Sequence, residues 1–597
     1  MVSTADGRSQ ATPEKPLVDY LRNLSSPVDG YSIDTATLEQ FRIPTSSGAE
    51  LDAWIRRPPG SDPQPLVLFI TPYYGGGSPD FPGNALGDPS RTLAEYLIPY
   101  GYAVGFLSVG GTGNSGGCFH NGGPIERQQL KDAVAFLGQQ SWSNAAVAAM
   151  GVSYDGTTAI ELFVDPPAEL KAVIPIEAIS DYYRYSFVNG IIRENTPFFT
   201  TYYYAIVGLG PVGLSGGVGP SSPTDFAVQL TGELCSEQLA YQQESLTAGI
   251  TGNRSDYWDE RDAIALLQQD AEHPRPAMFY IQGYQDANVD PQMTDGFIAA
   301  VKATGAPWHV WMGQWVHTYP QPRTGDCLPL EPCRGDFFEQ ALLAWLDQFL
   351  KGRDTGILDA PAVQTQADDG RWRYQDDWPP LTSTLQSWHL HADGQLNQQP
   401  SSGVVSYTDR IGARPEELRD IDGNLGPLND ALPIIAGTAI EFVSAPLSQP
   451  MRLTGVPQIV TRLSSDASRG NFTATLFAQN PAGERRYLNF ALQSLNHIVD
   501  PSAAASDISG EVLDLRLNFY PQDNIIEAGW QLVFMIAGDI PSADISTGSV
   551  SGNFLTTGPS ALPLGLGANI SLELSDTQLL LPVNNSDRLE PLSWGTN

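Results

Sequence analysis

The stretch AAVAAMGVSYDGTT, residues 145–158, constrains the fold more than any other part of the chain. A run of small apolar residues ends at Met150, residues 151–156 read GVSYDG, and a second apolar segment covers residues 159–164. A strand, a tight turn and a helix in this order form the elbow that lifts a nucleophilic serine above the edge of a sheet. G-x-S-x-x-G is a relative of the usual G-x-S-x-G pattern of that elbow. The stretch therefore predicts that Ser153 is a nucleophile, with a helix N-terminus behind it that favours negative charge.

Apolar runs of strand length alternate with helical segments on both sides of this elbow. The runs cover residues 65–73, 102–109, 171–178, 277–282 and 308–312, and the helical segments cover residues 90–100, 126–140 and 337–350. Continuous apolar runs suit strands that are buried on both faces, and their alternation with helices predicts a parallel sheet. Functional residues of such sheets lie at the carboxyl ends of the strands. Tyr73, Ser153 and the Gly-rich loop at residues 110–118 all fall at such ends.

The chain divides into segments of different character. An α/β domain is predicted for residues 31–180 and 273–352, after a leader at residues 1–30. Residues 181–272 are aromatic and Gly-rich without a buried-strand run, which indicates a helical cap inserted into the sheet domain. A linker at residues 353–377 leads to residues 378–597, where strand-like segments alternate with turn residues. This last pattern predicts an all-β sandwich of the jelly-roll type.

The base and the acid that a serine nucleophile needs are sought after later strands, because a histidine held by a carboxylate must lie beside the hydroxyl. Of the seven histidines, His317 is preferred because it follows the last predicted strand of the sheet. The others stand before the elbow, before a strand on the wrong side of the sheet, inside a strand or in the β domain (residues 120, 273, 309, and 389, 391 and 497, respectively). Asp286 is the first carboxylate after the strand at residues 277–282, and Asp290 is its only near rival.

An oxyanion hole needs two donors that point at the developing alkoxide. The backbone N–H of Tyr154, directly after the nucleophile, is one candidate. The second candidate is the hydroxyl of Tyr73, which follows an early strand, because a phenol donates a hydrogen bond as an amide does. The alternative for Tyr73 is an ordinary residue at the rim of the site.

The charge of the chain argues against two classes of partner. The sequence holds 67 acidic and 32 basic residues, for a formal net charge of −35. Nucleic acids and anionic membranes both need clustered Lys and Arg, so neither is expected as a partner. No run of 18 apolar residues occurs, so no membrane-spanning helix is predicted. No C-x-x-C pair is present, and neither a metal nor another cofactor is expected.

Four cysteines bear on the cellular compartment. Cys327 and Cys333 flank a short loop, Cys118 lies in the Gly-rich loop, and Cys235 lies in the predicted cap. Two disulfides in a secreted or periplasmic protein are the preferred interpretation. The alternative is four reduced thiols in a cytoplasmic enzyme. The polar N-terminus lacks the apolar core of a signal peptide.

The motifs in this order resemble those of a known family of serine hydrolases, the X-prolyl dipeptidyl peptidases together with the cocaine-esterase-like acyl hydrolases. The resemblance rests on GVSYDG, GYQDANV and GQWVH, on Pro72-Tyr73, and on SVGGTGNSGGC, which is similar to the Gly-rich loop of secreted actinobacterial-type Xaa-Pro dipeptidyl peptidases. Residues 174–190 and 255–262 look like the entry to and exit from the family's cap. The resemblance spans most of residues 40–597, including the jelly-roll domain.

This resemblance implies that Ser153, Asp286 and His317 form a catalytic triad, and that Tyr73 and the Tyr154 amide form the oxyanion hole. It also implies acyl transfer in two steps through an acyl-enzyme. An exopeptidase that releases N-terminal X-Pro dipeptides is the first interpretation. The alternative is an esterase or amide acyl-hydrolase that acts on small esters or amides. A third hypothesis, an inert hydrolase fold whose sandwich binds a ligand, conflicts with a complete triad in the correct order.

A dipeptidyl peptidase must also bind a free ammonium group at a fixed distance from the serine. The carboxylates considered for this role are Glu177, Asp181, Glu194, Asp259 and Glu260. The aromatic side chains considered for a proline-sized pocket are Tyr182, Tyr183, Phe198, Phe199, Tyr202 and Tyr203. Each of these residues also has an ordinary structural alternative, such as helix capping, an ion pair or cap core. The expected partner is a small peptide or ester, and a homodimer is a further expectation.

Overall fold

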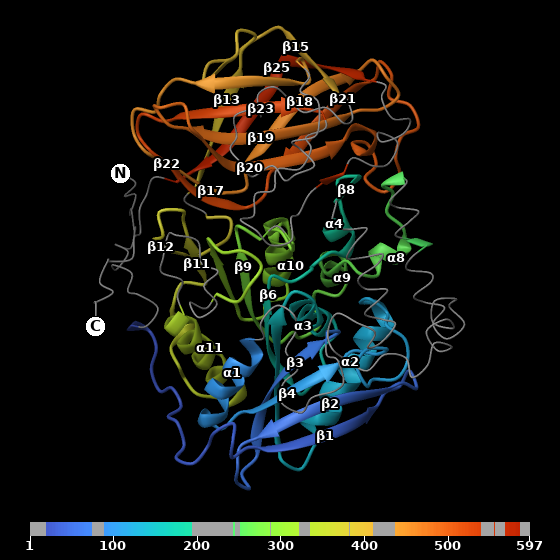
Figure 1. Ribbon diagram of the computed structural model, residues 1–597, viewed down its shortest axis with the longest axis vertical. Helices are drawn as coiled ribbons and strands as arrows, with labels where there is room; N and C mark the ends of the chain where they lie inside the picture. Colours follow the sequence, from blue (N-terminus) through green and yellow to red (C-terminus); the bar gives the residue numbers. More distant parts are fainter. Residues whose placement is uncertain are drawn as a thin grey trace, which may run out of the picture.

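The computed structural model describes residues 19–73, 89–193, 243–244, 251–286, 288–320, 335–380, 383–409, 436–538, 554–555 and 567–584. Its lower part in Figure 1 is built on one sheet of ten strands in the order β1-β2-β4-β3-β5-β6-β9-β10-β11-β12. The strands from β4 to β11 run parallel, while β1, β2 and β12 are antiparallel to their neighbours. The predicted parallel sheet is thus present. Its strands are β1 (Thr37–Pro44), β2 (Glu50–Arg57), β3 (Gln64–Thr71), β4 (Ala103–Ser108), β5 (Ser143–Val152), β6 (Leu170–Ile176), β9 (Ala277–Gly283), β10 (Trp308–Gly313), β11 (Val363–Gln366) and β12 (Trp372–Gln375).

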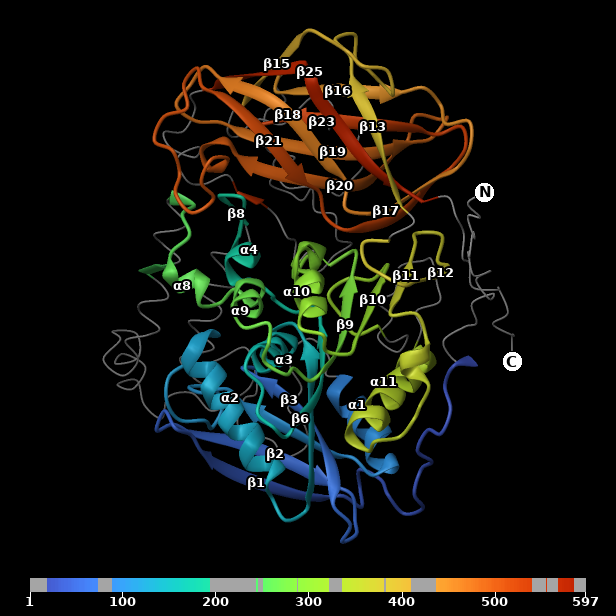
Figure 2. The same cartoon turned by 180° about the vertical axis from the view of Figure 1, so that it is seen from behind.

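Helices cover both faces of this sheet (Figure 2). One face packs against α1 (Pro89–Leu97) and α11 (Gly335–Leu350), and the other against α2 (Gly123–Gly138), α3 (Tyr154–Val164), α9 (Ala263–Gln269) and α10 (Phe297–Ala303). The apolar run of strand β3 is buried on both faces of the sheet. Leu66, Leu68 and Ile70 belong to one core, whereas Val67 and Phe69 belong to the other. Short 3₁₀ turns, η2 (Ile98–Tyr100), η4 (Pro291–Thr294) and η6 (Ile357–Asp359), complete this part.

Two boundaries of the α/β part differ from the expected ones. Residues 353–377 were expected to form a linker, but β11 and β12 lie within them and extend the sheet from β10. These strands are only four residues long and read VQTQ and WRYQ, so they lack the apolar run that marks a buried strand. Helix α9, at residues 263–269, packs on α3 and α10 and therefore belongs to the helical layer of the sheet rather than to the cap.

The described part of the expected cap contains α4 (Tyr182–Ser186), β7 (Phe187–Val188), β8 (Ile191–Arg193) and α8 (Asp256–Asp259). Strand β8 pairs with β7 and with β24 (Phe554–Leu555), a strand from near the end of the chain. Most of residues 181–272, including Glu194 and Phe198, lie outside the described residues. Among the described residues, no helix is long and apolar enough to cross a membrane.

The C-terminal part, at the top of Figure 1, is all-β, as expected. Two groups of strands enclose one apolar core, which includes Leu463, Phe472, Phe534 and Leu579. The jelly-roll assignment stays a prediction. The strands of the first group are β13 (Thr384–Leu390), β15 (Val404–Asp409), β17 (Met451–Gly455), β18 (Gln458–Ser465), β21 (Val512–Asn518), β22 (Gln522–Ile526) and β25 (Ala568–Val583). The second group comprises β14 (Gln395–Asn397), β16 (Ala439–Ser444), β19 (Asn471–Gln479), β20 (Arg485–Ser494) and β23 (Gln531–Ala537), and a 3₁₀ turn, η8 (Leu495–His497), follows β20.

Polar contacts connect the N-terminal segment and the β part to the α/β part. The backbone N–H and the hydroxyl of Ser25 donate to Asp347 in α11, at 2.6 and 2.7 Å. Asp523 of β22 accepts from Thr365 in β11 at 2.8 Å and pairs with Arg452 of β17 at 2.6 Å. The described residues of the expected leader are therefore held against the sheet domain.

Candidate active site

The chain turns sharply between β5 and α3, at the residue predicted as the nucleophile. Ser153 has φ of 64° and ψ of −128°, a conformation that L-residues rarely adopt outside functional turns. Its N–H donates to the carbonyl of Ile176 at 3.0 Å, and its carbonyl accepts from the N–H of Thr157 at 2.9 Å. These bonds tie the strained residue to β6 on one side and to the first turn of α3 on the other.

The two glycines of the motif are required by close packing. A Cβ at Gly151 would lie 2.3 Å from the Cβ of Asp155. A Cβ at Gly156 would lie 2.7 Å from the carbonyl oxygen of Gly151 and 2.8 Å from that of Ile176. Helix α3 can therefore start directly above the sheet only because neither position carries a side chain. The elbow predicted from the sequence is present.

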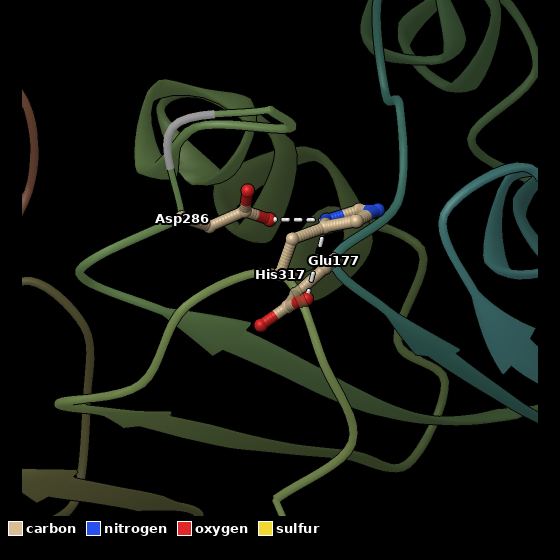
Figure 3. Close-up of side chains that lie close together, drawn as sticks. All are labelled: Glu177, Asp286 and His317. Carbon is tan, nitrogen blue, oxygen red and sulfur yellow. Dashed lines mark hydrogen bonds and ion pairs between the residues drawn. The ribbon is translucent and has the colours of Figure 1, made fainter. Parts of the chain in front are cut away.

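Asp286 and His317 meet at the carboxyl ends of the neighbouring strands β9 and β10 (Figure 3). The N–H groups of Tyr284 and Gln285 donate to the carbonyls of Gly313 and Trp315, at 2.7 and 3.1 Å, and these bonds join the two loops. As a result, His317 Nδ1 lies 2.8 Å from Asp286 Oδ2. The alternative acid, Asp290, lies instead at the start of η4, before Pro291.

The environment of Asp286 keeps it an acceptor. Its Oδ1 accepts from the backbone N–H groups of Asn288 and Val289, at 2.8 and 3.0 Å, and its exposed fraction is 2%. Because a carboxylate can only accept, the proton of a neutral His317 belongs on Nδ1, which leaves Nε2 as the base. Nε2 is buried and makes no hydrogen bond to the residues that the structure describes. The hydrogen bond between a catalytic base and its nucleophile often forms fully only when substrate binds.

The two expected oxyanion donors lie beside Ser153. The hydroxyl of Tyr73 is 3.5 Å from Ser153 Oγ. Tyr154 is the first residue of α3, where backbone N–H groups point out of the helix end. The rings of Tyr73 and Tyr154 pack edge to face with their centroids 6.5 Å apart. The arrangement is compatible with two donors around one developing negative charge.

Sequence reasoning missed a buried carboxyl group that anchors Tyr154. The Tyr154 hydroxyl donates to Glu126 in α2 at 2.8 Å and accepts from the N–H of Gly122 at the same distance. Burial raises the pKa of Glu126 to about 7, although the hydrogen bond from Tyr154 opposes this shift. Glu126 lies on the first turn of an amphipathic helix, where an acidic residue usually indicates only a favourable helix terminus. Its sequence context therefore contains no sign of this contact.

Glu177, considered above for an ammonium site, lies against His317. It follows β6, is fully buried, and its Oε2 is 3.3 Å from His317 Nδ1 (Figure 3). Burial and the charge of Asp286 raise the pKa of Glu177 well above its usual value. Burial alone would lower the pKa of His317, but Asp286 and Glu177 outweigh it and raise that pKa to about 10. The role of Glu177 as an ammonium ligand stays a prediction.

The other candidates for substrate contact have structural partners. Asp181 caps α4 by accepting from the N–H groups of Tyr183 and Arg184, and its Oδ2 lies 3.0 Å from Arg254 Nη1. Asp259 also pairs with Arg254, at 2.5 Å. Tyr182 is 2% exposed and packs edge to face on Tyr154. Glu194, Phe198, Phe199, Tyr202 and Tyr203 lie outside the described residues, so their predicted roles stay predictions.

Glu177, Asp286 and His317 also have the spacing of a metal site. Among the described residues, one potential ligand atom from each of them lies within 4.8 Å of the others. His317 offers Nδ1 to both carboxyl groups, and a hydrogen bond already accounts for the shorter of these contacts. The geometry is therefore explained by an imidazole with carboxyl partners.

Comparison with known proteins identifies the family. A model described as X-Pro dipeptidyl-peptidase (S15 family) matches residues 47–319, and one described as the X-Pro dipeptidyl-peptidase C-terminal non-catalytic domain matches residues 355–553. A Bacillus cereus protein that carries the name Xaa-Pro dipeptidyl-peptidase is 23% identical over 568 residues, which cover 87% of this chain and 89% of that protein. Cocaine esterase of a Rhodococcus species is 23% identical over 548 residues, which cover 85% of this chain and 91% of that protein.

A solved structure supports the fold. An aminopeptidase from a marine sediment archaeon of the Thaumarchaeota superposes with a TM-score of 0.71 over 98% of this chain and 100% of that chain, at 17% identity. The catalytic and C-terminal family models match in chain order and together span most of the sheet domain and most of the β domain. The chain belongs to the X-Pro dipeptidyl-peptidase (S15) family of serine hydrolases.

Proposed function

We propose that this protein is a serine exopeptidase that releases N-terminal X-Pro dipeptides through an acyl-enzyme. The observation that carries the chemistry is the Asp286–His317 contact of 2.8 Å at the same sheet edge as the strained Ser153. The family and the Bacillus cereus relative support the substrate class. The alternative, an esterase or amide acyl-hydrolase, is supported by the similarly extensive match to cocaine esterase.

In acylation, Ser153 Oγ attacks the carbonyl carbon of the scissile bond while His317 Nε2 takes the hydroxyl proton. Asp286 stabilises the imidazolium that forms, and the Tyr73 hydroxyl and Tyr154 N–H donate to the oxyanion. The imidazolium then gives its proton to the leaving amine as the carbon–nitrogen bond breaks. In deacylation, water attacks the ester, His317 accepts the proton of water, and the proton returns to Ser153.

The two activities differ in what they require at the N-terminal end of the substrate. A dipeptidyl peptidase must bind a free ammonium group, whereas an esterase with the same triad needs no such contact. With Asp181 paired to Arg254 and Glu177 buried against His317, neither carboxyl group stands as an unengaged partner for an ammonium group.

A comparison of three substrates tests the proposal. We expect rapid turnover of an Ala-Pro anilide, at least about 100-fold slower turnover of its N-acylated form, and slower turnover of a short-chain phenyl ester; a lost charge contact of about 3 kcal/mol corresponds to that factor. Preference for the ester with no penalty for N-acylation would contradict the exopeptidase proposal and favour the esterase. Retention of full activity by Ser153→Ala would contradict both.

We also propose export to an oxidising compartment. Cys118 is disulfide-bonded, which supports this location, since disulfides persist mainly outside the cytoplasm. Cys235, Cys327 and Cys333 lie outside the described residues, so the count of two bridges stays a prediction. Mass spectrometry of the unreduced protein, expected to show no reactive thiol, tests the redox state. Four titratable thiols would favour the cytoplasmic alternative. The expected homodimer also stays a prediction.

A further inference from the structure

Three neighbouring strands deliver three side chains to one point. Glu177, Asp286 and His317 follow β6, β9 and β10, which are adjacent in the sheet (Figure 3). Asp286 Oδ2 lies 2.8 Å and Glu177 Oε2 lies 3.3 Å from the same atom, His317 Nδ1. The imidazole of the base therefore has two carboxyl partners, where one suffices for a triad.

The backbone holds Glu177 in this place. Glu177 has φ of 48°, which is rare for a residue with a long side chain, and its N–H donates to the Ile281 carbonyl of β9 at 2.8 Å. The neighbouring strand leaves space for it, because a Cβ at Gly283 would lie 2.8 Å from Glu177 Oε1. The rare backbone conformation of Glu177 and the glycine required beside its side chain, Gly283, indicate that the position of this buried carboxyl group has a specific role.

Two carboxyl groups this close to one another cannot both remain charged at little cost. Asp286 has two backbone donors within 3.0 Å and the shorter contact with His317. Glu177 has the longer contact with His317, at 3.3 Å, and burial together with Asp286 outweighs the contacts with His317 and the Thr318 amide that lower its pKa. The negative charge therefore belongs on Asp286, and the proton belongs on Glu177.

The chemistry of the base supports this distribution. Burial alone would lower the pKa of His317, but Asp286 and Glu177 both raise it, to about 10. An imidazolium cannot take the proton of Ser153. When Glu177 is neutral, only Asp286 stabilises the imidazolium, and the base is available at a lower pH.

We propose that Glu177 is a positioning residue, a second carboxyl partner of His317 Nδ1 that stays protonated while Asp286 is ionised and replaces Asp286 as the triad acid when that residue is removed. This inference rests on the proposed function, in which Ser153 is the nucleophile and His317 the base. No proton is gained or lost by Glu177 in the normal cycle. The serine proton moves to His317 Nε2 and on to the leaving amine.

The surroundings of Glu177 make its charge state depend mainly on this pair. Asp286, from the loop after β9, and His317, from the loop after β10, are the charged side chains that act most on the pKa of Glu177. Tyr280 of β9 is a further buried titratable group that feels the charge of Glu177, and its hydroxyl donates to Gln282 at 3.0 Å. After burial, the charge of Asp286 is what most opposes ionisation of Glu177. Removal of the Asp286 carboxylate should therefore make Glu177 easier to ionise.

The test compares Glu177→Gln, Asp286→Ala and the double variant, with kcat and kcat/KM for the Ala-Pro anilide measured across pH. We expect Asp286→Ala to lose about 10- to 100-fold in kcat and the double variant about 10⁴-fold, which is the loss typical of a triad without a functioning acid. Asp286→Ala should also gain a rise in kcat with pH that the double variant lacks, because Glu177 must lose its proton to act. Glu177→Gln alone, in which the amide mimics a protonated carboxyl group, should lose less kcat than Asp286→Ala and leave the acid limb of the pH profile in place.

Equal losses of kcat in Asp286→Ala and the double variant would overturn the proposal. So would a Glu177→Gln profile whose acid limb moves down by a pH unit or more, since that result would mean that Glu177 normally carries a charge. Ser153→Ala distinguishes failure of this proposal from failure of the proposed function. Full activity of Ser153→Ala would mean that Ser153 is not the nucleophile, so that no triad exists for Glu177 to support. If a variant unfolds, the low-field Nδ1–H proton resonance of His317 in the wild type and in Glu177→Gln serves instead. An unchanged resonance would contradict a contact between Glu177 and Nδ1.

Discussion

Two buried clusters in this protein have similar compositions and different chemistry. At the sheet edge, Asp286 and Glu177 face His317. At the base of the cap, Asp181 and Asp262 face Arg254, with contacts of 3.0 and 2.7 Å. Each cluster places two buried carboxyl groups against one group that can be a cation, and Arg254 also pairs with the exposed Asp259. Arginine keeps its charge at any physiological pH, whereas histidine gains and loses its proton near neutrality.

This difference separates a structural cluster from a reactive one. Burial lowers the pKa of Arg254, but Asp181, Asp259 and Asp262 outweigh it and raise the pKa further, so the guanidinium is a permanent charge that joins α4 to α9 through the capping residues Asp181 and Asp262. The imidazole of His317 can instead exchange a proton with Ser153. The comparison predicts that changes at the two clusters affect different measured quantities.

The largest effect is expected on catalysis at His317. We expect His317→Ala to lower kcat by about 10⁶-fold with little change in the midpoint of thermal unfolding, because it removes the base and no large apolar surface. Activity on the Ala-Pro anilide and a thermal unfolding scan measure both quantities. His273→Ala, at a half-exposed histidine that pairs with Asp270, is the matched control and should leave both unchanged. A kcat within tenfold of the wild type would remove His317 as the base.

The next largest effect is expected on stability at Arg254. Arg254→Met should lower the free energy of unfolding by about 3–5 kcal/mol, because it leaves two buried carboxylates without their cation. Denaturant unfolding measures this value. Arg184→Met is the matched control, since Arg184 is 40% exposed and lies 3.7 Å from the same Asp181, and it should cost less than about 1 kcal/mol. Equal losses of unfolding free energy in both variants would mean that the buried ion pairs of Arg254 contribute no more to stability than the exposed contact of Arg184.

The smallest effect is expected at Glu126, a further buried carboxyl group, which accepts from the Tyr154 hydroxyl and the N–H of Gly122 rather than from a cation. Its pKa is about 7 in the folded chain and near the usual 4.5 when unfolded, so ionisation favours the unfolded chain as pH rises between these values. The unfolding free energy of Glu126→Gln, relative to that of the wild type, should therefore rise from about pH 4.5 to pH 7. Above pH 7 this difference should stay constant. Unfolding curves at several pH values test this slope. A difference that is independent of pH would show that Glu126 is ionised throughout.

The elbow and the Asp286–His317 pair follow from local sequence rules. Gly151 and Gly156 mark the elbow because a strand, a serine and a helix meet in a few residues, and their crowding is a property of that segment alone. Asp286 and His317 meet because parallel strands bring their carboxyl ends to one edge. Both features could be predicted without knowing which strands are neighbours elsewhere in the sheet.

Other features depend on contacts between distant segments. Glu177 reaches His317 because β6 pairs with β9, which lies about a hundred residues later in the chain, and the side-chain pattern of β6 does not encode that neighbour. The partner of Asp181, Arg254, is 73 residues away, beyond a segment without a clear periodic pattern. Strands β11 and β12 are short and rich in polar residues that are buried by tertiary contacts, such as Thr365 with Asp523.

Labelling of the nucleophile tests the central claim most directly. The protein is treated with a phosphonate probe that reacts covalently with activated serines, and the peptide that carries the added mass is identified by mass spectrometry. The account predicts one modified residue, Ser153, with no labelling in His317→Ala and slow labelling in Asp286→Ala that is lost when Glu177→Gln is added. A label on another serine, or an undiminished label on Ser153 in His317→Ala, would contradict it.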